Sequence, residues 1–194
     1  MTPSYNTHMV ASAHPRLENL LASLSLNLAD ESSAALERAS GLSGRANAAL
    51  LALEEILDDA HVGRLAQVLG LTHSGAVRLV TQLEAEGLAE RRPGADRRRV
   101  EVRLTPAGRR RAAAAREARD DVVRETTRDL DRTEAAALEE LLSKLIQTRV
   151  TARVERRRAG ETGAWWCRTC DFAACGRPEG HCPAQTAASA ALSP

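Results

Sequence analysis

The 45-residue stretch 62–106 most strongly constrains the fold, because it combines two short helical patterns with two short alternating segments. The first pattern places apolar residues on one helical face: Val62, Leu65, Ala66 and Leu69. Gly70 follows as a turn residue that tolerates a positive φ. The next helix is predicted over 72–86, with an inward face of Ala76, Val77, Val80 and Leu83. Two short helices that cross at a tight turn form a helix-turn-helix, and we predict one here.

The outward face of the second predicted helix carries polar side chains at regular spacing. Ser74, Arg78 and Gln82 recur at every fourth residue and therefore lie together. His73 and Gly75 stand at the N-terminal end, where a helix in the major groove brings side chains to base edges and amides to phosphates. We predict that these five residues contact double-stranded DNA.

Two segments after Gly87, 88–92 and 100–104, alternate like paired strands, and the loop 93–99 joins them. Five of the nine residues from 91 to 99 are arginine and one is acidic, although the net charge of the whole chain is only +1. A basic hairpin tip of this kind contacts phosphates and can insert Arg into a narrow minor groove. The basic side chains predicted to bind DNA here are Arg91, Arg92, Arg97, Arg98 and Arg99.

The remaining chain is predicted to be mainly α-helical. Aromatic residues make up only 2% of it, so the core must consist of Ala, Leu and Val, which favours closely packed helices. We expect helices over about 15–28, 32–40 and 43–57, and long helices over 106–127 and from about 131 to 158. The predicted organisation is a disordered start (1–14), N-terminal helices for dimerisation and support (15–60), the DNA-binding unit (61–106), C-terminal dimerisation helices (107–158), a cysteine-rich segment (164–184) and a flexible tail (185–194).

The last long helix carries one apolar stripe with four-residue spacing, made of Leu138, Leu142, Ile146, Val150 and Val154. A helix this long and this one-sided is not expected to bury its stripe within its own subunit. Together with the N-terminal helix it predicts a helical homodimer interface. No apolar run long enough to span a membrane occurs, and nothing resembles a signal peptide, so we expect a cytoplasmic protein with no membrane partner.

All four cysteines fall within 16 residues, at Cys167, Cys170, Cys175 and Cys182, with none elsewhere. Four thiolates with a C-x2-C start indicate a structural zinc site, and the glycines at 176 and 180 let the chain wrap a metal. The final Cys-Pro is typical of iron–sulfur ligation instead, and a disulfide or thiol redox switch is a third reading. His181 could replace one cysteine as a ligand. The adjacent Trp165 and Trp166 are expected to pack this segment onto the helices.

The segments LTHSGAVRLV (71–80), LEAEGLAERRPGADRRR (83–99) and LTPAG (104–108) together resemble the MarR family of winged helix-turn-helix regulators. The resemblance implies an obligate homodimer whose two reading helices occupy the halves of a near-palindromic site. It also implies that the hairpin formed by residues 88–104 is the wing, in which Asp96 stabilises the loop while Arg98 contacts the minor groove. Many members bind phenolic ligands in a crevice, but this chain has only four aromatic residues to line one, Trp165, Trp166, Tyr5 and Phe172. We therefore expect the sensor to be the cysteine segment.

The predicted function is a sequence-specific transcription regulator, with repression the commoner outcome in such a family. The alternatives are a similar regulator with purely structural zinc and a small-molecule effector, an iron–sulfur or thiol redox protein, and an architectural DNA binder without sequence preference. An enzyme is not expected, because Ser, His and carboxylates are scattered without a catalytic motif or a glycine-rich phosphate loop.

Overall fold

A computed structural model describes residues 13–55, 60–94 and 100–192. Most of the predicted disordered start and the tip of the predicted hairpin therefore lie outside the described residues. The chain order of the elements is α1 (Pro15–Ser40), α2 (Gly44–Glu55), α3 (Val62–Leu69), α4 (His73–Ala85), β1 (Ala89–Pro93), β2 (Val100–Leu104), α5 (Pro106–Thr127), α6 (Arg132–Arg158) and α7 (Pro183–Leu192). The predicted mainly α fold with a small two-stranded sheet is confirmed.

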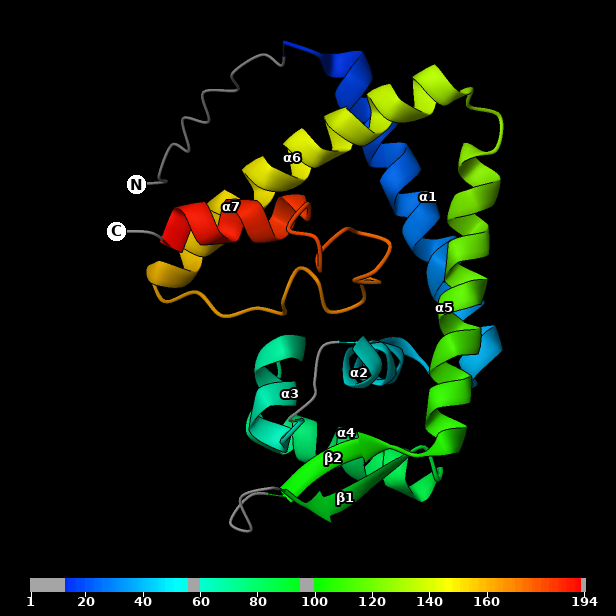
Figure 1. Cartoon of the computed structure of the whole chain (residues 1–194), viewed down its shortest axis with the longest axis vertical. Coiled ribbons are helices and arrows are strands. Elements are labelled where there is room, and N and C mark those ends of the chain that lie inside the picture. Colours follow the sequence, from blue (N-terminus) through cyan, green and yellow to red (C-terminus); the bar gives the residue numbers. More distant parts are fainter. Residues whose placement is uncertain (1–12, 56–59, 95–99, 193–194) are drawn as a thin grey trace, which may run out of the picture.

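Two long helices, α1 and α5, lie side by side along one edge of the molecule (Figure 1). The sequence predicted two helices within 15–40, but α1 runs unbroken to Ser40 and ends at Gly41 with a φ of 68°. That prediction was wrong because no glycine or proline interrupts the stretch, and serine within a helix costs too little to end it. Both α1 and α5 begin with a proline in the first turn, where its missing N–H is not needed.

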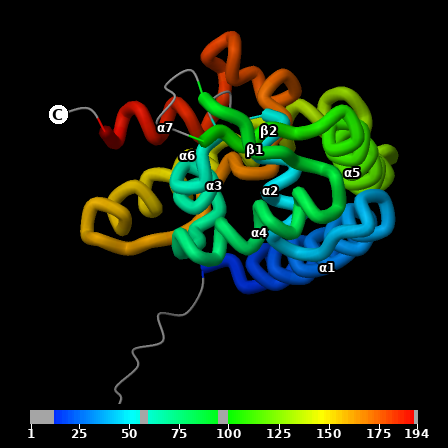
Figure 2. Tube along the Cα trace, turned by 90° about the horizontal axis from the view of Figure 1, so that it is seen from below, coloured from blue at the N-terminus to red at the C-terminus, as the bar shows by residue number. Residues whose placement is uncertain are grey.

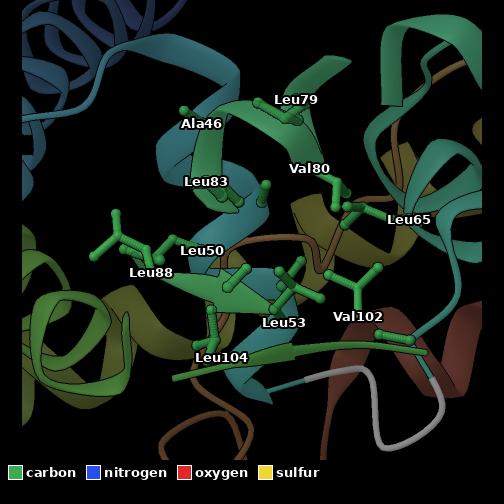
Figure 3. Close-up of a cluster of buried hydrophobic side chains, with 14 of the residues drawn as sticks. Ala46, Leu50, Leu53, Leu65, Leu79, Val80, Leu83, Leu88, Val102 and Leu104 are labelled. Carbon is green, nitrogen blue, oxygen red and sulfur yellow. The ribbon is translucent and has the colours of Figure 1, made fainter. Parts of the chain in front are cut away.

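The main core forms where α2, α3, α4 and the hairpin meet (Figure 3). Helix α2 is buried on nearly every side, as its Ala- and Leu-rich sequence predicted. Leu50 of α2, Leu65 of α3, Leu83 of α4 and Val102 of β2 are each 1% exposed or less. Aliphatic side chains alone therefore fill this core, apart from Trp165, which packs against its edge.

Strands β1 and β2 pair antiparallel, with Ala89 opposite Leu104 and Pro93 opposite Val100. The residues before α3 extend this sheet, since His61 bridges Glu101. Helix α5 starts directly against the sheet, and a Cβ at Gly108 would meet the carbonyl oxygen of Leu88 at 2.0 Å. A glycine is therefore required at this contact.

The C-terminal half of α6 packs against α7 within the same chain (Figure 1). The predicted flexible tail is wrong for residues 185–192, because Pro183–Leu192 forms a helix with Ala184 and Ala187 buried. Val150 of α6 is 5% exposed in this second cluster, and Ile146 and Val154 are partly buried beside it. The expectation that α6 buries none of its stripe within its own subunit is therefore wrong for this half. The small side chains of α7 let the two helices approach closely.

Candidate nucleic-acid interface and cysteine cluster

Helix α4 is fixed at both ends by local chemistry. The Thr72 hydroxyl accepts a hydrogen bond from the backbone N–H of Gly75 at 3.1 Å, which caps the first turn. Four residues of α4 face the core: Ala76, Leu79, Val80 and Leu83. The predicted inward position of Val77 is only half right, because that residue is half-buried and Leu79 lies inside instead. The helix is thus anchored along one face and free along the other.

The free face of α4 carries the predicted base-reading side chains. His73, Ser74, Arg78 and Gln82 are all exposed, and Gly75 is half-buried beneath them. Arg78 makes no ion pair with any residue that the structure describes, so its guanidinium is available to a ligand. Gln82 donates to the Glu86 carboxylate at 3.2 Å, and Ser74 shares a hydrogen bond with Thr72 at 3.3 Å. Figure 1 shows α3, α4 and the hairpin together at one end of the molecule, and Figure 2 looks onto that end.

The two arginines of β1 differ in their surroundings. Arg91 pairs with Glu84 of α4, and its backbone N–H donates to the same carboxylate at 3.1 Å. This arginine therefore connects the hairpin to α4. Within the described residues Arg92 forms an ion pair only with Glu90, at 2.7 Å, and its side chain is 61% exposed. The other predicted wing residues, Asp96, Arg97, Arg98 and Arg99, lie outside the described residues.

The cysteine segment brings its thiols together in one cluster. The thiols of Cys167, Cys170, Cys175 and Cys182 lie close enough to shift one another's pKa. Hydrogen bonding from Cys170, with help from the Arg177 guanidinium, lowers the pKa of Cys167 to about 6 against the opposing effect of burial. The same contact and burial raise the pKa of Cys170, and burial raises the pKa of Cys175. One thiol of the cluster is therefore acidic and two are not.

The cluster has the composition of the predicted metal site without its geometry. Within the described parts of the chain, no three His, Cys, Asp or Glu side chains form a group arranged to hold a metal ion. His181 is exposed, and its backbone N–H donates to the carbonyl of Gly176 at 2.8 Å. Cys182 precedes α7, where its carbonyl accepts from the N–H of Thr186 at 3.0 Å.

The cysteine segment also docks onto the helix-turn-helix, which the sequence did not predict. The N–H of Trp165 donates to the carbonyl of Val68 in α3 at 2.7 Å, and the Arg64 guanidinium lies 4.3 Å from the Trp165 ring centre. Gly70 has a φ of +62°, and a Cβ there would meet the backbone nitrogen of Ala164 at 2.4 Å. The turn glycine therefore has a second purpose, which is to admit the backbone of this segment.

Two further contacts hold the segment against the body of the protein. The N–H of Phe172 donates to the Glu55 carboxylate of α2 at 3.3 Å, and Arg119 of α5 donates to the carbonyl of Thr169. Figure 1 shows the segment between the α6–α7 pair and helices α2 and α3. In the sequence, the one signal of this docking was the pair of tryptophans, which make up half of the four aromatic residues of the chain. Trp165 packs against the main core as expected, whereas Trp166 is 39% exposed.

Comparison with known proteins assigns the DNA-binding part. Residues 40–99 match the family model described as MarR family. This part of the chain is similar to MarR family proteins. A MarR family protein from Bacillus stearothermophilus is similar in structure, with a TM-score of 0.61 and 26% identity, over 69% of this chain and 93% of the other. The YusO protein from Bacillus subtilis has a TM-score of 0.60 at 20% identity, over 70% and 98% of the two chains.

A third similar structure is CouR from Rhodococcus jostii bound to p-coumaroyl-CoA, with a TM-score of 0.53 and 24% identity, over 70% of this chain and 94% of that one. The search of curated proteins found no match. The MarR-type chain is a DNA-binding transcription regulator and not an enzyme. Among the described helices, none combines the length and the apolar character that crossing a membrane requires.

Proposed function

We propose that the protein is a transcription repressor that binds a near-palindromic operator as a homodimer. The observation that carries this proposal is the face of α4 that presents Ser74, Arg78 and Gln82 to solvent while the opposite face is buried in the core. A helix held in this way can enter the major groove without rearranging. The guanidinium of Arg78 can bind the O6 and N7 acceptors of a guanine with two hydrogen bonds.

The proposed wing contact comes from the hairpin beside α4. Arg92 is exposed there, and the sequence places Arg97, Arg98 and Arg99 in the connecting loop. Charges in such a loop bind phosphates or the minor groove and add affinity that does not depend on the base sequence. In this proposal α4 supplies the preference for an operator, and the hairpin supplies the general affinity.

The proposed dimer interface uses leucines that the single chain leaves uncovered. In α1, Leu17, Leu20, Leu21 and Leu24 are between 47% and 61% exposed. In the N-terminal half of α6, Leu138, Leu141, Leu142 and Leu145 are between 37% and 58% exposed. Scattered single leucines are ordinary on a surface, but two helices with apolar rows of this length indicate a protein interface. A second copy of the chain is the partner that would place two α4 helices on one site.

The test is a comparison of operator preference between Arg78→Ala and a matched control, Arg132→Ala. Arg132 is an exposed arginine at the start of α6, far from α4 (Figure 1). We expect Arg78→Ala to reduce the preference for a selected operator over random DNA by about fivefold or more, since one bidentate base contact contributes about 1–3 kcal/mol. Arg132→Ala should leave this preference unchanged.

The contrary result is a loss of affinity for Arg78→Ala that is equal on operator and random DNA. Such a uniform loss would assign Arg78 to a phosphate contact. Failure to select any preferred sequence would favour the architectural DNA binder. Repression itself is tested by transcription in vitro, where operator occupancy should lower transcript yield.

A second candidate function is a metal centre at the four cysteines, either zinc or an iron–sulfur cluster, with a role in sensing redox or metal state. Its support is the proximity of the thiols of Cys167, Cys170, Cys175 and Cys182, which shift one another's pKa. The segment would close around the ion by small shifts, because its loops turn at Gly176 and Gly180 with positive φ. Binding an ion requires the thiolates and releases protons.

The metal content and absorption spectrum of anaerobically purified protein test this second function. Iron with a brown colour means an iron–sulfur cluster, whereas zinc in a colourless solution means a zinc site. Cys170→Ser should abolish metal retention in either case. Protein that contains no metal and four titratable thiols would overturn the metal centre and leave thiol redox chemistry.

A further inference from the structure

A cavity of about 590 Å³ lies between α6, α7 and the cysteine segment. Pockets that bind small organic molecules have volumes of this order, about 300–1,000 Å³. Its aliphatic wall is formed by Val150 and Val154 of α6 and by Ala184, Ala188 and Leu192 of α7. The cavity is completed by α7 and the cysteine segment, which follow the long helices and pack against the C-terminal half of α6.

Both tryptophans of the chain line this one cavity. Trp165 is fixed by its hydrogen bond to Val68, and Trp166 is 39% exposed beside it. Two indole rings in a pocket offer flat, polarisable surface to an apolar or aromatic body. The scarcity of aromatics led us to expect no aromatic-lined ligand site, and the fold corrects this by gathering half of them at one place.

Arginines dominate the charge of the cavity, and the one acidic group of its lining is the Cys167 thiol, which lies beside Arg177 and has a pKa of about 6. Four arginines line it, Arg153, Arg157, Arg158 and Arg177, and none of the lining residues is Asp or Glu. Arg153 and Arg157 each donate to the backbone of the loop after α6, at the carbonyls of Ala164 and Gly163. Arg158 is exposed and makes no ion pair within the described residues. An anion would therefore find at least one guanidinium without a carboxylate partner.

We propose that this cavity binds a small amphipathic anion, with a flat apolar body against the tryptophans and an acidic head at Arg158. The head can be a carboxylate, sulfonate or phosphate, because a guanidinium forms paired hydrogen bonds with each of these planar or tetrahedral groups. Apolar walls with a few charged groups at one side are the usual make-up of such a site.

Two contacts connect the residues around the cavity to the DNA-binding helices. Trp165 lines the cavity and donates to Val68 in α3, and Ala164 lies against Gly70 in the turn before α4. A ligand that moves Trp165 must therefore strain or release the helix-turn-helix. This regulatory step rests on the proposed function, whereas the binding of the anion does not.

Titration of the full-length protein with anilinonaphthalene sulfonate tests the site without DNA. The two tryptophans report binding directly, by quenching of their emission and energy transfer to the probe. We expect tighter binding than for phenylnaphthylamine, the neutral probe with the same apolar body, by about tenfold or more. Equal affinity for the two probes would overturn the proposal, since it would mean that the exposed leucines bind the apolar body without any role for charge.

Arg158→Gln and Arg149→Gln are the matched variants, since Arg149 lies on the same helix, is exposed and does not line the cavity. The first should remove about tenfold of the sulfonate affinity and the second should leave it unchanged. Equal effects of both variants would also overturn the proposal.

Displacement of the sulfonate probe by naphthoate or by naphthyl phosphate then identifies the preferred head group. The regulatory step is tested separately, by operator affinity at saturating ligand. An unchanged operator affinity would overturn regulation through Trp165 while the measured binding still stands. If the ligand-free protein bound no operator, the proposed function itself would be wrong, whatever the result for the anion.

Discussion

Replacing Gly70 with alanine tests how the cysteine segment is joined to the helix-turn-helix. The substitution adds one methyl group at a residue with a φ of +62°, and that methyl would lie 2.4 Å from the nitrogen of Ala164 and 2.7 Å from the carbonyl carbon of Gly163. Backbone atoms at these distances must move. The segment 163–165 is then displaced from α3, and the hydrogen bond from Trp165 to Val68 is weakened or lost.

The chain provides a matched control in Gly87, which follows α4. Gly87 has a φ of +69°, but nothing lies within 4 Å of a Cβ placed there. Gly87→Ala should therefore cost only the left-handed backbone conformation, about 1–2 kcal/mol. Gly70→Ala should cost the same strain plus about 1–3 kcal/mol for the amide of Trp165, which loses its partner. The expected difference between the two variants is thus at least about 1 kcal/mol.

Urea unfolding followed by circular dichroism measures this difference, and the tryptophan emission, to which Trp165 and Trp166 both contribute, provides a second readout. In thermal unfolding, a further loss of about 1 kcal/mol in the free energy of unfolding lowers the melting temperature of a chain of this size by about 2–4 °C. Gly70→Ala should also change the tryptophan emission of the folded protein, while Gly87→Ala should not. Equal destabilisation by both variants, with unchanged emission, would refute the contact between Ala164 and the turn.

Three other predictions concern oligomerisation, thiol chemistry and DNA affinity. Leu24→Glu and Leu141→Glu should each convert a dimer into a folded monomer in analytical ultracentrifugation, because both side chains are at least half exposed in the single chain. In reduced, metal-free protein, Cys167 should be alkylated by iodoacetamide at neutral pH, with a rate that falls as the pH drops below its pKa of about 6. Cys170, whose pKa is raised, should stay unmodified in the same peptide map. Arg92→Ala should weaken binding to all DNA sequences alike and reduce the slope of log affinity against log salt by about 1.

Local patterns were sufficient to predict the helix-turn-helix and the hairpin. The apolar spacing of α3, the positive φ at Gly70 and the alternation of the two strands depend on neighbours a few residues apart. For the same reason Arg78 could be assigned to the outward face of α4 from its spacing alone. The unbroken α1 was not predicted, because a serine-rich stretch has no local signal strong enough to decide between one helix and two.

The sequence by itself determined the helix-turn-helix with its hairpin and the cluster of four cysteines, since both follow from the spacing of residues that are close in the sequence. The tertiary structure alone decided what the C-terminal segment touches. Trp165 is close to Val68 only because α5 and α6 carry the chain out and back, and the tail becomes a helix only because α6 offers an apolar face to its alanines. Both tryptophans and four arginines likewise share one cavity through contacts between distant parts of the chain. Such contacts depend on the whole fold, and no local pattern records them.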